Sequence, residues 1–144
     1  NILKLKVGES FVISPDEPHA YISGDLIECM VNSDNVIRGG LTPKLKDTKT
    51  LMSLLKYEFK ERKQNSGVEL VNTKSTYMVE YKTGYAEFMV TKLTMGPSEE
   101  EQTVDKTFNS LSIAIVLSGS ASVAIDGFDP CTMEDKSCYF IMPG

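Results

Sequence analysis

Short stretches in which apolar and polar residues alternate predict that the chain is built mainly from β-strands. Alternation is typical of a strand because successive side chains point to opposite faces of a sheet. The pattern predicts strands at residues 2–6, 10–14, 26–30, 77–81, 87–95, 111–117, 122–125 and 137–142. One stretch has a helical period instead, since Leu51, Leu54 and Phe59 fall on one face with charged residues between them. We therefore expect one amphipathic helix, with Asp47 or Thr48 as its cap, in a mainly β chain.

Composition and charge exclude several classes of protein. Hydrophobic residues make up 41% and charged residues 24% of the chain, which is typical of a folded domain. The net charge of -5 argues against a general nucleic-acid binder, which needs a basic excess. The sequence has no apolar run long enough for a membrane span, and "NILKLKVGES" is unlike a signal peptide. We expect a cytoplasmic protein that binds neither nucleic acid nor membranes.

The chain is poor in the residues that build self-contained metal sites. It has a single histidine, His19, in the stretch "EPHAYISGD". Its cysteines, Cys29, Cys131 and Cys138, are irregularly spaced and form no CxxC motif. We expect reduced, mostly buried thiols and no structural zinc site, with a disulfide between one pair left open. By itself, one histidine in a proline-rich turn favours a structural role.

Two stretches resemble motifs of the cupin barrels. Gly8 and His19 have the spacing of the glycine and histidine in the second cupin motif, and "VLSGSASVAIDG" (116–127) is similar to the end of the first motif. The resemblance implies cupin-like, jelly-roll β-barrel material with the motifs in reversed order. It predicts a chain truncated at both ends: residues 1–46 complete a catalytic barrel, 47–66 form a connecting helix, and 67–144 form an incomplete second domain.

A longer stretch is more specific for a family. "HAYISGDLIECMVNSDNVIRGGLTPK", residues 19–44, closely resembles the signature of the type I mannose-6-phosphate isomerases. The chain departs from it at Val31 and Gly39, where the family usually has alanine. Residues 87–144 are more loosely similar to the C-terminal cupin-like domain of that family. A match at so many fixed positions identifies the chain as related to these enzymes.

The resemblance implies an enzyme that interconverts mannose 6-phosphate and fructose 6-phosphate through a cis-enediol, in carbohydrate metabolism that leads to GDP-mannose. It also implies a zinc ion, Zn2+, with His19 as one ligand. The family's other ligands, a Gln, a His and a Glu, lie upstream of Asn1. We therefore expect the chain to need the missing N-terminal part of the same protein and to be inactive alone.

The same resemblance gives roles to five further residues. Arg38 corresponds to an essential arginine that holds the substrate or stabilises the enediolate. Lys44, with other lysines nearby, suits the substrate phosphate. Tyr21, Glu28 and Asp34 match polar residues that line the substrate pocket.

The residues alone leave other readings of these positions open. Arg38 could equally form an ion pair with Asp34. Lys44 could be a solvated charge in a loop, and Tyr21 could be an aromatic residue that packs at the mouth of the barrel. Glu28 interrupts an apolar stretch and should have a partner such as Arg38 or Lys44. Gly39 and Gly40 suit a close backbone approach or a positive φ.

Two other functions remain open on the sequence. One is a non-catalytic cupin domain that binds a sugar or is only structural. The other is an Fe(II) oxygenase of the cupin class, although its usual ligand set needs two histidines. The metal content of the full-length protein separates these functions. Zinc together with isomerase activity favours the mannose-6-phosphate isomerase, whereas iron together with oxygen consumption favours the oxygenase.

Overall fold

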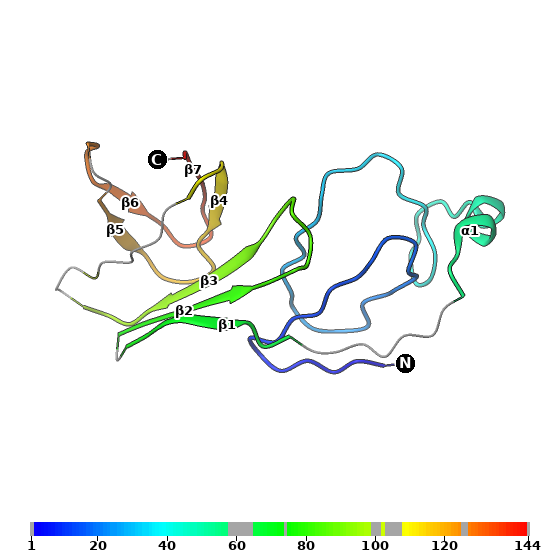
Figure 1. The fold of residues 1–144 in the computed structure, drawn as a ribbon, viewed down its shortest axis with the longest axis horizontal. Coiled ribbons are helices and arrows are strands. Elements are labelled where there is room, and N and C mark those ends of the chain that lie inside the picture. The colour runs from blue at the N-terminus through cyan, green and yellow to red at the C-terminus, as the bar shows by residue number, and fades with distance from the viewer. Residues whose placement is uncertain are drawn as a thin grey trace. The chain divides into compact units, whose positions relative to one another are not determined.

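The computed structural model describes residues 2–57, 65–73, 75–98, 102, 108–124 and 127–143. The chain divides into two compact units, Asn1–Glu100 and Glu101–Gly144. The elements run α1 (Thr48–Leu54), β1 (Val68–Asn72), β2 (Thr76–Tyr81), β3 (Val90–Met95), β4 (Ser112–Ile115), β5 (Ala121–Val123), β6 (Cys131–Met133) and β7 (Cys138–Ile141) (Figure 1). This confirms the predicted mainly β class, although the described strands form open sheets and no closed barrel.

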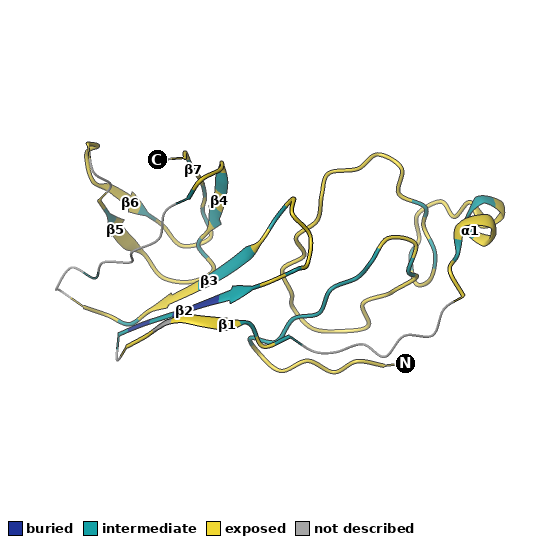
Figure 2. Ribbon diagram, in the orientation of Figure 1, coloured by how far each residue is buried: buried dark blue, intermediate teal, exposed yellow. Residues whose placement is uncertain are grey.

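The first unit contains an antiparallel sheet in the order β1-β2-β3. Its central strand, "TYMVEY", is rich in the aromatic and β-branched residues that fit a pleated surface. Because β2 has a neighbour on each side, its backbone is paired along both edges. The buried core of the described residues lies on this strand, at Thr76, Met78 and Val79 (Figure 2).

Residues 2–57 trace loops outside the short helix α1 (Figure 1). The strands predicted at 2–6, 10–14 and 26–30 are therefore wrong. Within that range, Ser10 alone forms a β-bridge, pairing with Asn65 through two backbone hydrogen bonds of 2.8 Å. Alternation records which side chains suit a strand, but a ladder also needs a second strand within hydrogen-bonding distance.

The helix is confirmed at its start and is shorter than predicted. Asp47 caps α1, since its Oδ1 accepts a hydrogen bond from the backbone N–H of Thr50 at 3.0 Å. The helix ends at Leu54, and residues 55–57 and 65–66 are not helical, so a helix through residue 66 is wrong. The intervening predicted positions, 58–64, lie outside the described residues. No residue of α1 is buried, and without a packed face a short helix gains little stability.

The second unit contains two antiparallel pairs, β4 with β7 and β5 with β6. In the first pair Ile113 lies opposite Phe140, and these side chains are 62% and 70% exposed. The opposite face is half-buried, at Ala114 and Tyr139. The sequence pattern missed β1 and β6, because neither carries a long alternating run. The predicted domain limits at 46 and 66 stay a prediction.

The chain exposes an unusually large surface. Its accessible area is 12340 Å². The usual scaling of area with mass gives about 7,000 Å² for one folded domain of this size and about 9,000 Å² for two separate ones. Large apolar side chains remain exposed in both units, including Leu41, Leu45, Phe128 and Met142. The chain therefore buries less apolar surface than self-contained domains do.

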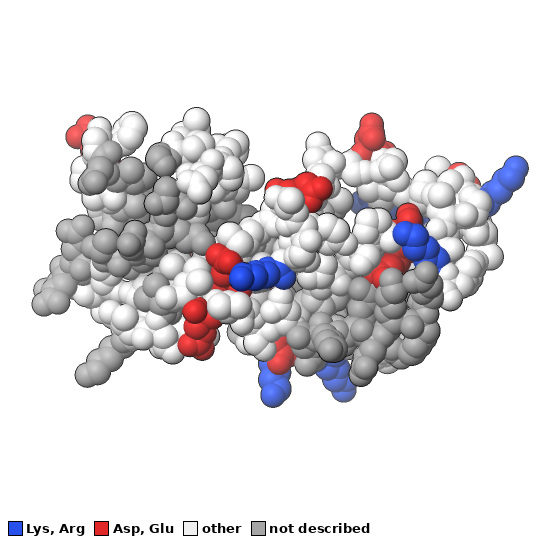
Figure 3. Space-filling model, viewed as in Figure 1, with Lys and Arg blue, Asp and Glu red and all other residues white. Residues whose placement is uncertain are grey.

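Three smaller observations complete the fold. All three cysteines are free and exposed, so the prediction of mostly buried thiols is wrong. In the part of the chain that the structure describes, no helix has the length and apolarity that crossing a bilayer requires. On the face seen in Figure 3, acidic and basic side chains are interspersed and do not gather by sign.

Candidate functional site

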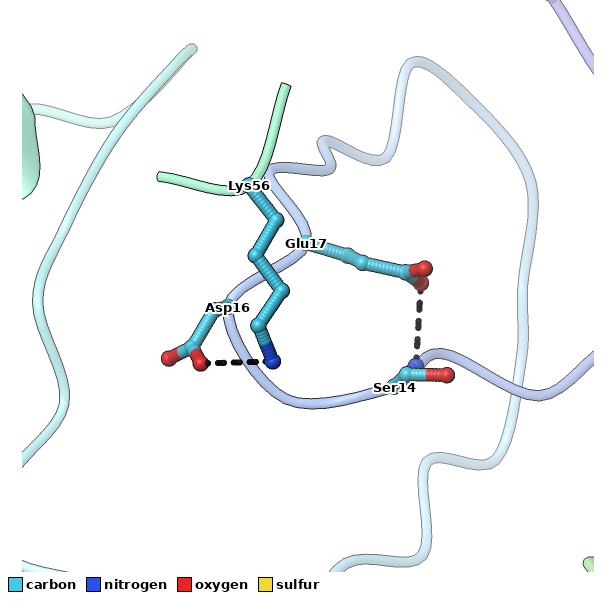
Figure 4. A network of polar contacts seen from close by, with 4 residues as sticks. All are labelled: Ser14, Asp16, Glu17 and Lys56. Atoms are coloured by element: carbon cyan, nitrogen blue, oxygen red, sulfur yellow. Dashed lines mark hydrogen bonds and ion pairs between the residues drawn. The ribbon is translucent and has the colours of Figure 1, made fainter. Parts of the chain in front are cut away.

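His19 follows a turn that polar contacts hold in shape (Figure 4). The backbone N–H of Ser14 donates to the Glu17 carboxylate at 3.0 Å and closes the turn. Asp16 lies at its tip with a φ of 62°, a conformation that aspartate tolerates better than most residues. Lys56, just beyond α1, reaches the Asp16 carboxylate at 3.1 Å. These contacts link the turn to the helix and position the residue that follows.

The imidazole of His19 has one nitrogen engaged and one available. Its Nδ1 lies 3.0 Å from the backbone carbonyl oxygen of Glu17. A carbonyl can only accept, so in the neutral imidazole Nδ1 carries the hydrogen and Nε2 keeps its lone pair. The ring of Tyr21 meets the imidazole edge-on, with centroids 5.7 Å apart. The side chain of His19 is exposed, so Nε2 is accessible to a ligand.

Tyr21 and Glu28 are joined by a side-chain hydrogen bond. The Tyr21 hydroxyl donates to Oε1 of Glu28 at 2.7 Å. Partial burial, and then the bonded Glu28 carboxylate, raise the pKa of Tyr21 to about 12. Glu28 thus has the partner that its position predicted, but that partner is the Tyr21 hydroxyl and not Arg38 or Lys44, the two candidates that the sequence suggested. Its side chain is exposed in a loop, where the tyrosine hydroxyl seven residues away is the nearer partner.

A hollow of about 350 Å³ opens beside His19. It lies between the two ends of the family-like stretch and is lined by Pro18, His19, Ala20, Ile22, Gly40 and Leu41. Gly40 has a φ of 63°, and a Cβ added there would lie 3.6 Å from the Cβ of Ala20. This confirms the positive φ and the close approach expected at Gly40, and it explains how residues twenty positions apart share one hollow.

Arg38, Asp34 and Lys44 are exposed, and among the described residues none of their side chains bonds to His19, Tyr21 or Glu28. Among the described residues, no ion pair joins Arg38 to Asp34, so the alternative of a salt bridge between them is wrong. The Lys44 backbone N–H donates to the Thr42 hydroxyl at 3.2 Å. The structure thus brings His19, Tyr21 and Glu28 together and does not join the two cations to them. The roles of these six residues stay predictions.

Sequence reasoning missed Glu17, which acts through its backbone and its side chain. Its carbonyl orients His19, and its carboxylate closes the preceding turn. The signal was present, because an acidic residue between two prolines is typical of a turn whose side chain bonds the local backbone.

His19 fits the chemistry of one zinc ligand. Ligating histidines usually donate their second ring N–H to a carbonyl or carboxylate, and Nδ1 of His19 does so. Within the described ranges, no three His, Cys, Asp or Glu side chains come together as a ligand set. A zinc site that uses His19 therefore requires ligands from beyond these residues.

The comparisons with known proteins agree with the family-like stretch. The chain is 36% identical to a mannose-6-phosphate isomerase of Candida albicans across 100% of its own length and 34% of that protein. A rat enzyme of the same name is 34% identical over 87% of the chain and 29% of its own length. One from Cryptococcus neoformans reaches 60% identity over 58 residues, 40% of the chain and 13% of that protein.

The chain thus spans about a third of the length of the curated relatives it matches. No protein-family model matches it, and no solved structure does. The identity to the Candida albicans enzyme extends over the whole chain, well beyond the stretch at 19–44. The chain is therefore related by sequence, over all of its length, to the mannose-6-phosphate isomerases.

Proposed function

We propose that the full-length protein containing this chain interconverts mannose 6-phosphate and fructose 6-phosphate. The proposal rests on one observation: the relatives that align with the whole chain, or nearly all of it, are named mannose-6-phosphate isomerases. The geometry supports it, because the histidine of the family-like stretch presents a free Nε2 beside a hollow.

The proposed chemistry moves a proton between C1 and C2 of the sugar through a cis-enediol. Negative charge develops on the enediolate oxygens only as the proton leaves. Arg38 stabilises that negative charge, because a guanidinium stays protonated at any physiological pH and offers hydrogen-bond donors in a fixed plane. The acid–base residue that carries the proton is not among the roles we assign.

The remaining site residues bind parts of the substrate that do not react. Lys44, with Lys46 and Lys49 close in sequence, holds the phosphate. The Tyr21 hydroxyl donates its hydrogen bond to Glu28, so the hydroxyl oxygen can accept a hydrogen bond from a sugar hydroxyl. Glu28 and Asp34 accept from further hydroxyls.

We also propose that Nε2 of His19 is one ligand of a zinc ion. When bound, zinc supplies a Lewis acid that polarises the carbonyl and hydroxyl oxygens of the sugar. His19 contributes an imidazole whose orientation is set by Glu17 before any metal arrives. The other ligands come from the part of the polypeptide that the relatives have and this chain does not span.

The surface of the chain supports a requirement for that further polypeptide. The candidate site lies in residues 19–44, and most of these side chains are exposed in the chain alone. Ile22 and Leu41, which line the hollow, are 71% and 78% exposed. A pocket that stabilises an enediolate must exclude water, so the 144 residues alone are expected to be inactive. We place the full-length enzyme in the cytoplasm, where exposed thiols such as these stay reduced.

The test compares the full-length protein with the 144-residue chain in one assay. The full-length protein should convert mannose 6-phosphate to fructose 6-phosphate and contain about one zinc per subunit, and the shorter chain should do neither. Chelation should abolish the activity, and added zinc should restore it. Iron with oxygen consumption, or sugar binding without turnover, would instead support one of the two alternative cupin functions.

A further inference from the structure

A second hollow, of about 260 Å³, lies outside the candidate isomerase site. It is enclosed by the loop Lys6–Glu9 on one side and by one face of the sheet on the other. At about 30 Å³ per water molecule, the volume corresponds to roughly nine waters, which is the size of a small metabolite.

The floor of the second hollow is a regular sheet face. Tyr77, Val79 and Tyr81 are alternate residues of β2 and therefore point to the same side. Lys92 of β3 is paired with Val79, and directly opposite residues of an antiparallel pair share a face. Val79 is 2% exposed, whereas Tyr77, Tyr81 and Lys92 around it are half-buried and so remain partly accessible. The floor presents two aromatic rings and one cation.

The wall is tied to the floor by contacts between residues far apart in sequence. The Tyr81 hydroxyl donates to the carbonyl oxygen of Gly8 at 2.6 Å. Next to it, Ser10 and Asn65 exchange backbone hydrogen bonds of 2.8 Å in both directions. Figure 1 shows the N-terminal segment turning beside the start of β1. The hollow is therefore formed before any ligand binds, which lowers the entropic cost of binding.

Two lysines without an ion-pair partner among the described residues line the hollow. Lys6 contributes one ammonium from the wall and Lys92, which is half-buried, another from the floor. Among the described residues, neither lysine takes part in an ion pair. Glu9 also lines the hollow, but its Oε2 accepts from the Lys6 backbone N–H at 2.8 Å. Glu69, paired with Val79 in the sheet, is a second carboxylate on this face, and it accepts from the Tyr77 hydroxyl. The two ammonium groups without an ion-pair partner are thus the charges open to an anionic ligand, and partial burial of Lys92 strengthens such a contact.

The tyrosines indicate what else the ligand carries. The Tyr77 hydroxyl donates to Oε1 of Glu69 at 3.0 Å, so its oxygen can only accept from a ligand. The hydroxyl of Ser66 at the rim can donate to an oxyanion. We propose that this hollow is a binding site for a small phosphate ester with hydroxyl groups: Lys6 and Lys92 hold the phosphate, and Tyr77 accepts from a hydroxyl.

This proposal is independent of the isomerase activity and is tested on the full-length protein. The probe is sorbitol 6-phosphate, which has hydroxyls and a phosphate but no carbonyl to isomerise. Two readouts are used: the affinity by calorimetry, and the protection of each lysine from acetylation by mass spectrometry. The variants are Lys92→Met and Lys6→Met. Lys82→Met is the matched control, because Lys82 is exposed near the end of β2 and does not line the hollow.

The probe should protect Lys6 and Lys92, and each of these two substitutions should weaken binding at this site by about tenfold or more. Lys82→Met should bind the probe as the parent does, and turnover of mannose 6-phosphate should change less than about twofold in Lys92→Met. Protection confined to Lys44 would overturn the proposal, because the probe would then occupy only the candidate isomerase site. Equal affinity of the parent and Lys92→Met at the protected site would overturn it too. A protein with no isomerase activity that still protects Lys6 and Lys92 would refute the proposed function alone.

Discussion

Two regions of the first unit contrast sharply: the loop region, residues 2–57, and the sheet region, residues 68–95. Two valines illustrate the difference, since Val7 is 99% exposed and Val79 is 2% exposed. The loop region holds every residue of the candidate isomerase site. The sheet region holds all the buried core that the described residues form.

The contacts that shape the two regions differ in range as well. Around His19, the side chains are set by partners two to seven residues away, such as Glu17 and Glu28. In the sheet region, a ladder of backbone hydrogen bonds pairs β2 with both neighbours. Short-range polar contacts can orient a side chain but bury little apolar surface. The candidate site thus lies in the region where the chain buries the least apolar surface, as is common for loops on a scaffold.

The largest expected effect is a loss of catalytic rate when a residue of the loop region is substituted. In the full-length enzyme, Arg38→Ala should lower kcat by about 100- to 1000-fold, because enediolate charge develops only in the transition state. Zinc content should stay unchanged. Steady-state kinetics and metal analysis check both.

Lys44→Ala is the contrasting variant for Arg38→Ala. The charge of the substrate phosphate is constant through the reaction, so this change should raise KM and leave kcat nearly as it was. If Arg38→Ala raises KM alone, or removes the zinc, the role assigned to Arg38 is wrong.

The next effect concerns stability in the sheet region. Met78→Ala should lower the free energy of unfolding by about 2–3 kcal/mol, near the lower end for such changes because the core is one thin layer. Met52→Ala, at a helix position 57% exposed, should change it by less than about 0.5 kcal/mol. Hydrogen exchange of the β2 amides measures the difference. Equal effects of the two substitutions would remove the contrast between the regions.

Two glycines test how far the tight packing extends around Val79. Gly67 and Gly84 have φ values of 81° and 82°, so alanine is strained equally at both. A Cβ on Gly67 would collide with the Val79 side chain, whereas at Gly84 no atom of the described residues lies within 4 Å, apart from its two chain neighbours. Gly67→Ala should therefore destabilise the protein by about 1–3 kcal/mol more than Gly84→Ala. Similar unfolding midpoints in urea would show that the sheet region can relax around the added methyl.

The smallest expected effect is a titration in the sheet region. The hydrogen bond to Glu69 raises the pKa of Tyr77 above its ordinary value of about 10. Because the raised pKa belongs to the folded state, this stabilisation is present below pH about 10 and is lost as the pH rises through the folded pKa.

Glu69→Gln should bring the pKa of Tyr77 back toward the ordinary value and flatten this loss at alkaline pH. Magnetic resonance of the ring carbons follows the titration of each tyrosine. Glu87→Gln is the control, since Glu87 is exposed in a loop before β3. An unchanged Tyr77 titration in Glu69→Gln would show that the hydrogen bond does not control it.

Much of the fold class and part of the site followed from the sequence by itself. Alternation predicted β2, β3, β4 and β7, because strands that find partners need side chains suited to a pleated face. Asp47 predicted the start of α1, since capping depends only on residues within one turn. The positive φ at Gly40 was predictable for the same local reason. The stretch at 19–44 predicted a relationship to the mannose-6-phosphate isomerases, and the similarity to the Candida albicans enzyme extends over the whole chain.

Tertiary structure alone decided the features that depend on long-range partners. The loops at 2–6, 10–14 and 26–30 have strand-like patterns but no neighbouring ladder, and a hydrogen-bonded strand exists only in a pair. Glu28 has the Tyr21 hydroxyl as its partner and not Arg38, because the path of the backbone decides which groups meet. The second hollow joins Lys6 to Lys92 through the fold, and no spacing in the sequence records that distance.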